Sequence, residues 1–548
     1  MLAGHNARSE DWQRAGGDSP NKSKRAEAGD ISSNAAWGGI QMHAKTIAIV
    51  GAGLAGLSTG CYAQMNGYST HIFEHHSKAG GVAAAWRRDG YLIDGGIHFL
   101  MGHKPGTVTY RLYEELGIVQ CNHFPDMTIY GRFIDEASGK TIDLTFDLDR
   151  LEKDLKRIAP VDSKVVENMI SDIRRMERAD LVGMMSTEKP PELMGLLDKL
   201  RMFWRMHRVL RFFRGRYSKP MKDNPLGAQD PLLRKVLENL FLPEVPLWFV
   251  LMIMALVANR QMGLLEGGCP DFVEPIERKY RSLGGELTYG AKVEKIVVEN
   301  GKAVGVRFAD GTEHRADIVV SAADGYSTIF GMLGGEFVDD RIKERYQSWK
   351  LIKPTIIVSF GVSRTFPGEP PFSSIMVKDP LRIGNDNIPG FGVRIFNYST
   401  KFAPAGKTVV QVLVESSWDY WNNLRSDRAR YEAEKKRIAA EVLKRLERYY
   451  PGISSRVEVE DVATPYTLWR YTLNHKGAYM SWLPAADKIL ETIPRTLPGL
   501  SNFYMAGQWT TPGGSVPTSL FSGRQLIEVL CNQDGKKFVV PKQEMREP

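Results

Sequence analysis

Three glycines near the N-terminus have the spacing of a nucleotide-binding turn. Glycine stands at positions 51, 53 and 56. In such a turn the first glycine permits a tight bend, the second lets the backbone approach a pyrophosphate, and the third allows the strand and helix to pack closely. An acidic residue at the end of the next strand would accept hydrogen bonds from a ribose. The sequence therefore predicts a dinucleotide site that includes Gly51, Gly53, Leu54, Ala55, Gly56 and Glu74.

The residues on either side of this glycine turn (residues 51–56) have the patterns of the elements that must position it. Residues 45–50 are a β-branched run typical of a buried parallel strand, and residues 54–66 have helical periodicity. Residues 69–73 predict a second strand that ends at Glu74. Bound phosphates would lie at a helix N-terminus, where free N–H groups and the helix dipole favour negative charge. A purely structural turn is the alternative, and this combination of elements argues against it.

Two further glycine-rich regions narrow the identity of the dinucleotide, because they resemble segments of a known family. One consists of Gly80-Gly81 and residues 89–96, and the other is the closing segment (residues 502–517) with residues 522–524. Both resemble the flavin segments of the amine oxidase and phytoene desaturase superfamily. The likeness is greatest to its phytoene desaturase, carotenoid isomerase and retinol saturase branch. It covers about residues 45–535 and is specific only in its terminal motifs.

The resemblance implies that the cofactor is FAD. The superfamily usually has arginine after the paired glycines, where this chain has Val82, and Arg87 or Arg88 is expected to replace that phosphate contact. No second glycine motif of this kind follows a strand, so no nicotinamide site is predicted and the electron acceptor stays open. The further FAD-binding residues implied are Gly80, Gly81, Arg88, Gly95, Gly96, Val293, Gly507, Gly514, Val516, Pro517 and Ser522.

Four residues are candidates for catalysis or for contact with the substrate: His98, Arg470, Tyr471 and Trp509. The resemblance places His98 near the isoalloxazine ring, and histidine often carries protons in enzymes. A hydrogen-bonded structural histidine is the alternative. For Trp509, which lies in the closing segment, the alternative is core packing. For Arg470 and Tyr471, expected on the substrate side, the alternative is a surface-exposed strand.

The order of the elements predicts an α/β fold. A Rossmann-type FAD-binding domain, with three layers around a parallel sheet, is expected from residues 42–145, 265–330 and 470–536. A mixed α+β substrate domain is inserted, made of a helical cap region (residues 146–264) and residues 331–469. Residues 1–41 are expected to be a disordered extension and residues 537–548 a C-terminal tail.

Composition argues against other classes of protein. The formal net charge of +8 is small for 548 residues, and no nucleic-acid-binding signature accompanies it. Cys61, Cys121, Cys269 and Cys531 have no paired spacing, so neither a disulfide framework nor a metal site is predicted and a cytoplasmic location is expected. The longest apolar run, residues 247–258, is shorter than the ~20 residues that span a bilayer. It predicts a buried helix beside an apolar tunnel.

Residues 197–217 combine arginine and lysine with aromatic side chains, and two interpretations are open. As a basic aromatic helix, the segment would lie peripherally in a membrane interface and admit a lipid-soluble substrate. As part of the cap, its aromatic side chains would face their own core and its arginines would face water. The second interpretation is slightly favoured.

These features favour an FAD-dependent oxidoreductase that acts on carbon–carbon bonds of a long, apolar, carotenoid- or isoprenoid-like substrate. Desaturation is the first expectation, followed by saturation or cis–trans isomerisation. An amine oxidase is the alternative enzyme. A non-enzymatic binder of prenylated proteins, similar to the GDP dissociation inhibitors, is the alternative of another class, and the intact glycine turn speaks against it.

Overall fold

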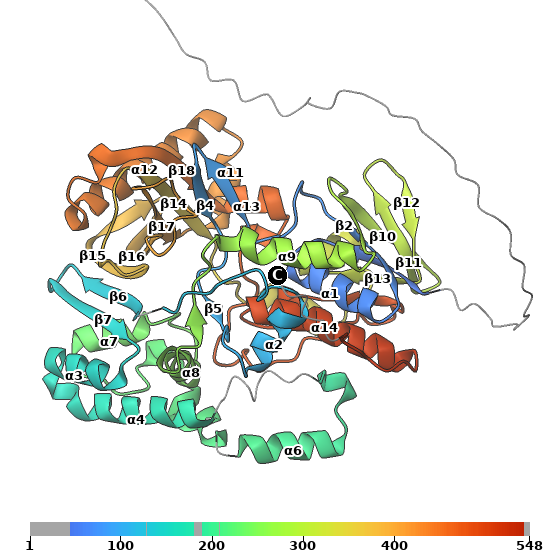
Figure 1. Ribbon diagram of the computed structural model, residues 1–548, viewed down its shortest axis with the longest axis horizontal. Coiled ribbons are helices and arrows are strands. Elements are labelled where there is room, and N and C mark those ends of the chain that lie inside the picture. The colour runs from blue at the N-terminus through green and yellow to red at the C-terminus, as the bar shows by residue number, and fades with distance from the viewer. Residues whose placement is uncertain (1–43, 128, 180–188, 208, 542–548) are drawn as a thin grey trace, which may run out of the picture. The chain divides into compact units, whose positions relative to one another are not determined.

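The glycine turn joins the first strand of a parallel sheet to the first helix (Figure 1). Strand β1 (Thr46–Val50) ends at the turn, and helix α1 (Leu54–Met65) begins within it. The computed structural model describes residues 44–127, 129–179, 189–207 and 209–541. The extension expected at residues 1–41 lies outside the described residues, and so do residues 542–548 of the C-terminal tail.

The parallel sheet has five strands and is covered on both faces. Ile47 and Ile49 of β1 pack in one core with α1, α9 (Gly268–Ser282) and α14 (Val516–Gln533). Ala48 and Val50 point the other way and pack against a three-stranded antiparallel sheet, β10 (Val293–Glu299), β11 (Lys302–Phe308) and β12 (Glu313–Arg315). This gives the three layers that the sequence predicts. The strand order is β19 (Phe503–Met505), β13 (Ile318–Ser321), β1, β2 (Ser69–Phe73) and β9 (Glu286–Thr288).

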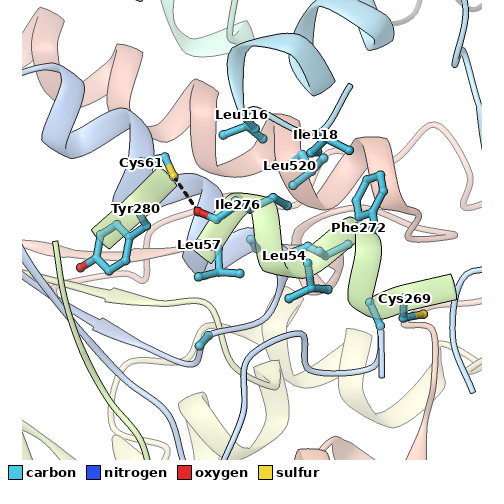
Figure 2. Close-up of a cluster of buried hydrophobic side chains, with 14 of the residues drawn as sticks. Leu54, Leu57, Cys61, Leu116, Ile118, Cys269, Phe272, Ile276, Tyr280 and Leu520 are labelled. Atoms are coloured by element: carbon cyan, nitrogen blue, oxygen red, sulfur yellow. Dashed lines mark hydrogen bonds between the residues drawn. The ribbon is translucent and has the colours of Figure 1, made fainter. Parts of the chain in front are cut away.

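Helix α1 is buried on nearly all sides because α9 and α14 both pack against it (Figure 2). Leu54 and Leu57 lie among side chains of α9, and the Cys61 thiol donates to the carbonyl of Ile276 at 3.6 Å. On the α14 side the close approach requires Gly523, because a Cβ there would lie 2.6 Å from the backbone nitrogen of Thr59. Helices α1 and α14 therefore pack closely against each other next to the glycine turn.

A second sheet of seven mixed strands belongs to the expected substrate domain. Helix α12 (Arg428–Tyr449) covers it with one apolar stripe, which includes Ile438, Val442 and Leu446 and shares a core with β14 and β17. Its strand order is β18 (Val457–Ala463), β14 (Thr355–Val362), β17 (Thr408–Glu415), β16 (Asp386–Ile395), β15 (Phe372–Ile383), β6 (Ile129–Asp135) and β7 (Lys140–Thr145).

The position of β6 and β7 corrects one boundary drawn from the sequence. The stretch 42–145 was assigned to the FAD-binding domain, but its last two strands extend the seven-stranded sheet. Strand β6 pairs in parallel with β15, with Arg132 opposite Ser373, and β7 pairs with β6. Hydrogen bonding to a strand more than 200 residues later in the chain decides this placement.

The helical cap region contains α3 (Leu148–Ile158), α4 (Ser163–Ala179), α6 (Leu196–Met206), α7 (Pro231–Glu238) and α8 (Leu247–Ala258). Helix α8 is apolar all round and packs against α4. The continuous helix considered for residues 197–217 is interrupted: α6 is followed by two short helical turns, Leu210–Phe213 and Gly215–Ser218. Gly215 has a φ of +61°, which a right-handed helix cannot contain.

Shorter elements connect these layers: β3 (Ala85–Arg88), β4 (Tyr91–Asp94), β5 (Leu100–Met101), α2 (Val108–Glu115), β8 (Met262–Gly263), α10 (Asp340–Ser348), α11 (Trp418–Leu424) and α13 (Pro465–Thr472). Within the described ranges, no helix has both the length and the apolar character needed to cross a membrane.

Candidate active site

The glycine turn is packed so closely that side chains cannot replace its glycines freely. Gly51 has a φ of +95°, and a Cβ added to Gly56 would lie 1.9 Å from the Gly51 carbonyl oxygen. The paired glycines run alongside: the amide of Gly80 donates to the Ala52 carbonyl at 2.9 Å, and Gly53 forms a parallel β-bridge with Gly80. Gly81 lies next to Gly53, with 3.3 Å between an added Cβ and the Gly53 Cα. Bare backbone therefore forms the floor of the predicted phosphate site.

Glu74 is fixed at the edge of this floor. Its carboxylate is buried and accepts hydrogen bonds from the backbone amides of Ala52 at 2.7 Å and His76 at 2.8 Å. Burial raises the pKa of the Glu74 carboxyl, and the two amide donors oppose that shift. The side chain thus links the glycine turn to the end of β2, at the place expected for a ribose-binding carboxylate.

The closing segment returns to the same region from the other end of the chain. Gly507 has a φ of +107°, and its amide donates to the hydroxyl of Ser522 at 2.8 Å. The Ser515 hydroxyl accepts from the Thr518 amide at 3.2 Å and so caps α14. Val516 and Pro517 form the first turn of that helix, whose amino end carries partial positive charge.

Many of the residues predicted to bind FAD line one cavity of about 1310 Å³. Apolar side chains of α8, among them Trp248, Met252 and Leu256, line another part of it. Residues of β16 and residues 479–484 complete much of the wall. The cavity is therefore continuous between the glycine-rich segments and an apolar chamber. The predicted residues along it are Leu54, Gly95, Gly96, Gly514, Val516, Pro517 and Ser522.

The other residues predicted from the sequence lie in different surroundings. His98 lines the cavity, and its ring stacks on Tyr479 with 6.0 Å between ring centres. Trp509 is buried in an aromatic cluster with Trp482, edge to face at 5.5 Å, and does not line the cavity. The guanidinium of Arg88 pairs with Asp461 at 2.8 Å. Val293 is buried behind the parallel sheet.

Arg470 and Tyr471 lie on α13, which is a helix where the alternative interpretation expected an exposed strand. Tyr471 is half exposed, and its ring meets His76 edge to face at 5.1 Å. The Arg470 carbonyl contacts the ring of His75 at 3.2 Å. These contacts place both residues beside His75 and His76, which follow Glu74. Neither residue lines the cavity.

Sequence reasoning missed the polar group where the cavity meets the seven-stranded sheet. Arg394 on β16, together with Tyr398 and Tyr479, lines the wall close to His98. Burial and the nearby Arg394 charge hold the pKa of His98 well below its ordinary value, so this ring is neutral at physiological pH. The signal available in the sequence was faint, since Arg394 is a single charged residue in an otherwise apolar half of a strand.

The chain resembles known proteins over most of its length. Residues 54–526 match the family described as flavin containing amine oxidoreductase. Prolycopene isomerase of Daucus carota is 24% identical over 87% of this chain and 78% of its own. A 4,4'-diapophytoene desaturase of Methylomonas sp. is 23% identical over 90% of this chain and 96% of its own. The solved structure of putrescine oxidase bound to putrescine has the same fold, with a TM-score of 0.56 and 15% identity over 89% of this chain and 99% of that one.

The residues present fit FAD. The floor of bare glycine backbone leaves room for a pyrophosphate, and a Cβ at Gly56 would push the helix away from the Gly51 carbonyl that shapes this floor. Glu74 lies where a ribose-binding carboxylate is expected, at the end of β2 beside the glycine turn, and the amino end of α14 borders the cavity. When bound, FAD supplies hydride transfer, and the protein provides orientation and electrostatics. The cofactor is FAD, the chain is a flavin-dependent oxidoreductase, and it belongs to the flavin containing amine oxidoreductase family.

Proposed function

We propose that the chain desaturates carbon–carbon bonds of a long, apolar, carotenoid- or isoprenoid-like substrate. The observation that carries the proposal is the cavity of about 1310 Å³, which joins the FAD-binding segments to an apolar chamber. Relatives named as a diapophytoene desaturase and a prolycopene isomerase, at 23–24% identity, support the same substrate class. Cavities of this kind suit extended apolar ligands because most of their wall offers no hydrogen bonds.

The chain's own residues would bind and orient such a substrate. Helix α8 presents Trp248, Met252 and Ile253 to the chamber and excludes water from it. His98 and Tyr479 lie where the chamber meets the Gly95-Gly96 segment, and both rings are neutral at physiological pH because burial disfavours their charged forms. A neutral histidine brings no charge into the apolar site until its unprotonated ring nitrogen accepts a proton.

Anaerobic turnover of the FAD-loaded protein tests this proposal. Phytoene, prolycopene and a panel of primary amines are each mixed with the oxidised enzyme, and flavin bleaching at its visible absorbance is followed. We expect bleaching with phytoene, together with a product that has a longer conjugated chromophore. Bleaching by amines alone, with peroxide released in air, would identify an amine oxidase. Prolycopene conversion without net bleaching would favour isomerisation over desaturation.

We further propose that the protein works in the cytoplasm, in peripheral contact with a membrane, and that α6 makes this contact. Helix α6 exposes an apolar surface that includes Leu197, 81% exposed, and Trp204, 76% exposed, with Lys199 and Arg201 beside it. The short turn Pro191–Leu193 just before α6 contributes Pro191 and Glu192 to the cavity wall. A bilayer touching α6 would therefore lie next to a route for an apolar substrate.

Sedimentation with vesicles of phosphatidylcholine and phosphatidylserine checks this contact. Changing both Leu197 and Trp204 to serine is expected to weaken vesicle binding roughly tenfold or more, since each apolar side chain contributes about 1.5–3 kcal/mol when buried. The control is Val161→Ser, which removes another exposed apolar side chain outside α6. Equal binding by all three proteins would exclude α6 as the contact.

A further inference from the structure

Arg394 is a charged side chain buried in the wall of the cavity. It lies on β16, is 5% exposed, and lines the cavity. One nitrogen, Nη1, donates to the side-chain oxygen of Gln411 at 3.2 Å and lies 3.5 Å from the carbonyl of Asp94. The guanidinium also lies over the ring of Phe396, with 4.6 Å from its carbon to the ring centre. These neutral partners hold the group in place without neutralising its charge.

Among the described residues, no carboxylate forms an ion pair with Arg394. Burial raises the pKa of the nearby Asp94 carboxyl and the Arg394 charge opposes this shift, but the carboxylate forms no ion pair with the guanidinium and accepts from the amides of Gly96 at 3.1 Å and Cys269 at 2.6 Å. The other arginine of the cavity wall, the partly buried Arg495, does have a carboxylate partner, Glu192 at 3.2 Å. A buried guanidinium without a carboxylate at ion-pair distance is costly, so the site of Arg394 favours a bound anion.

The groups near Arg394 that line the cavity are neutral and include hydrogen-bond donors. Burial and the Arg394 charge lower the pKa of His98, while burial raises the pKa of Tyr479 against the opposing effect of Arg394, so an uncharged ring and an undissociated hydroxyl face the same part of the cavity. Tyr398 also contacts Arg394, and its pKa is raised by burial. A cation surrounded by neutral donors matches the needs of a carboxylate, which accepts several hydrogen bonds and is bound well by a guanidinium fork.

Part of the wall beyond the Arg394 group is apolar and unsuited to a small polar anion. Beyond the Arg394 group the cavity is bordered by Trp248, Phe249, Met252 and Leu256, and its volume of about 1310 Å³ far exceeds that of a carboxylate. An occupant that satisfies both parts has one charged end and a long apolar body. The apolar body of such a ligand needs no polar partner between the Arg394 group and the apolar side chains.

We propose that Arg394 binds a carboxylate at one end of a long apolar substrate and so selects an acid over a neutral polyene. This inference rests on the proposed function, whose substrate class it narrows. Because the carbonyl of Asp94 lies directly before Gly95-Gly96, the charged end would lie beside an FAD-binding segment and the apolar body would extend toward α8. Arg394 would thereby set which carbons of the substrate face the flavin.

Ligand affinity distinguishes this role from a structural one. The FAD-loaded protein is titrated with all-trans-retinoate, its methyl ester and retinol, and binding is followed by tryptophan fluorescence and by the flavin absorbance. Hydrogen bonds to charged groups contribute about 1.5–3 kcal/mol, so we expect the acid to bind at least about tenfold more tightly than the ester. Arg394→Gln is expected to abolish this preference and leave the affinity for the ester unchanged.

Two further variants separate the effect of the charge from an effect on folding. Arg394→Lys retains the charge and is expected to retain most of the preference for the acid, even if Arg394→Gln folds poorly. Arg364→Gln is the matched control: its guanidinium lies over Phe366 at 4.9 Å and donates to the Pro451 carbonyl at 2.8 Å, but it does not line the cavity. This control is expected to bind all three ligands like the unmodified protein.

Several outcomes would overturn the proposal. Equal affinity of the unmodified protein for acid and ester is one, and a preference that survives in Arg394→Gln is another. A variant that keeps the preference but shows a lowered flavin midpoint potential would assign the Arg394 charge to the reduced flavin instead. Failure of the proposed function is recognised separately, by a purified protein without flavin absorbance or by a flavin that only amines bleach. In either case the tryptophan fluorescence titration still tests the role of Arg394.

Discussion

Replacing Gly56 with alanine is expected to leave the purified protein nearly free of FAD. The new Cβ would lie 1.9 Å from the Gly51 carbonyl oxygen, so the backbone of the glycine turn must move. Overpacking of this kind costs about 1–3 kcal/mol. If the whole cost falls on FAD binding, the affinity for FAD decreases roughly 5- to 150-fold. The ratio of flavin to protein absorbance after gel filtration measures the loss.

A second glycine provides the control for this change. Gly331 has open space around its Cα and a backbone conformation that alanine tolerates, so Gly331→Ala is expected to retain FAD fully. If Gly56→Ala also retained FAD at the level of the unmodified protein, the glycine turn would not be the phosphate site. A loss of FAD in both variants would point to a general effect of substitution on folding.

The second large effect concerns Asp324, a buried carboxyl just after β13. Its Oδ2 accepts from the Ser327 amide at 2.7 Å, but its Oδ1 has no hydrogen-bond partner among the described residues. Burial raises its pKa from 3.8 to about 6. The change in the free energy of unfolding caused by Asp324→Asn is therefore expected to be more stabilising at pH 8 than at pH 4. The difference is up to about 3 kcal/mol, at 1.36 kcal/mol for each pKa unit.

The direction of this pH dependence follows from proton binding. Because the folded-state pKa lies above that of the unfolded chain, the folded protein holds its proton more tightly between pH 3.8 and about 6. The stability that protonation gives is complete below pH 3.8 and is lost as the pH rises through about 6. His475, which contacts this segment, has its pKa lowered by burial to about 4, so it is neutral at pH 6 and pH 8 and about half protonated at pH 4. Urea unfolding at pH 4, 6 and 8 measures the difference, and an equal effect of the substitution at pH 4 and pH 8 would contradict it.

Local patterns predicted most of the cofactor-binding fold. The β-branched run at residues 45–50, the glycine turn and the helix after it each specify their structure with neighbours close in sequence. The Asp310-Gly311 pair likewise marks the tight connection between β11 and β12. Where partners are distant, prediction was incomplete. The pattern of residues 286–298 does not reveal that β9 joins the parallel sheet and β10 the antiparallel one.

The candidate site divides in the same way. The glycines and Glu74 carry their function in the backbone and in fixed spacing, so the sequence displays them directly. Arg394 lacks any such signature, because its surroundings are side chains from distant parts of the chain that line the same cavity. The resemblance also placed Arg88 at a phosphate, whereas its guanidinium pairs with Asp461 on β18. Side-chain partners across domains are set by tertiary packing, which periodicity does not encode.

The pairing of α1 with α14 has a consequence for how the enzyme is made. Gly51 and Ser522 stand near opposite ends of the chain, and the lysine at position 45 bonds to Asp534 at 2.5 Å. A ribosome must release almost the whole polypeptide before the cofactor pocket exists, so nascent chains cannot acquire FAD early. Contacts of such sequence separation form slowly. Cells would thus hold a pool of newly made apoprotein whose apolar chamber is open, and FAD supply would govern how long that pool persists.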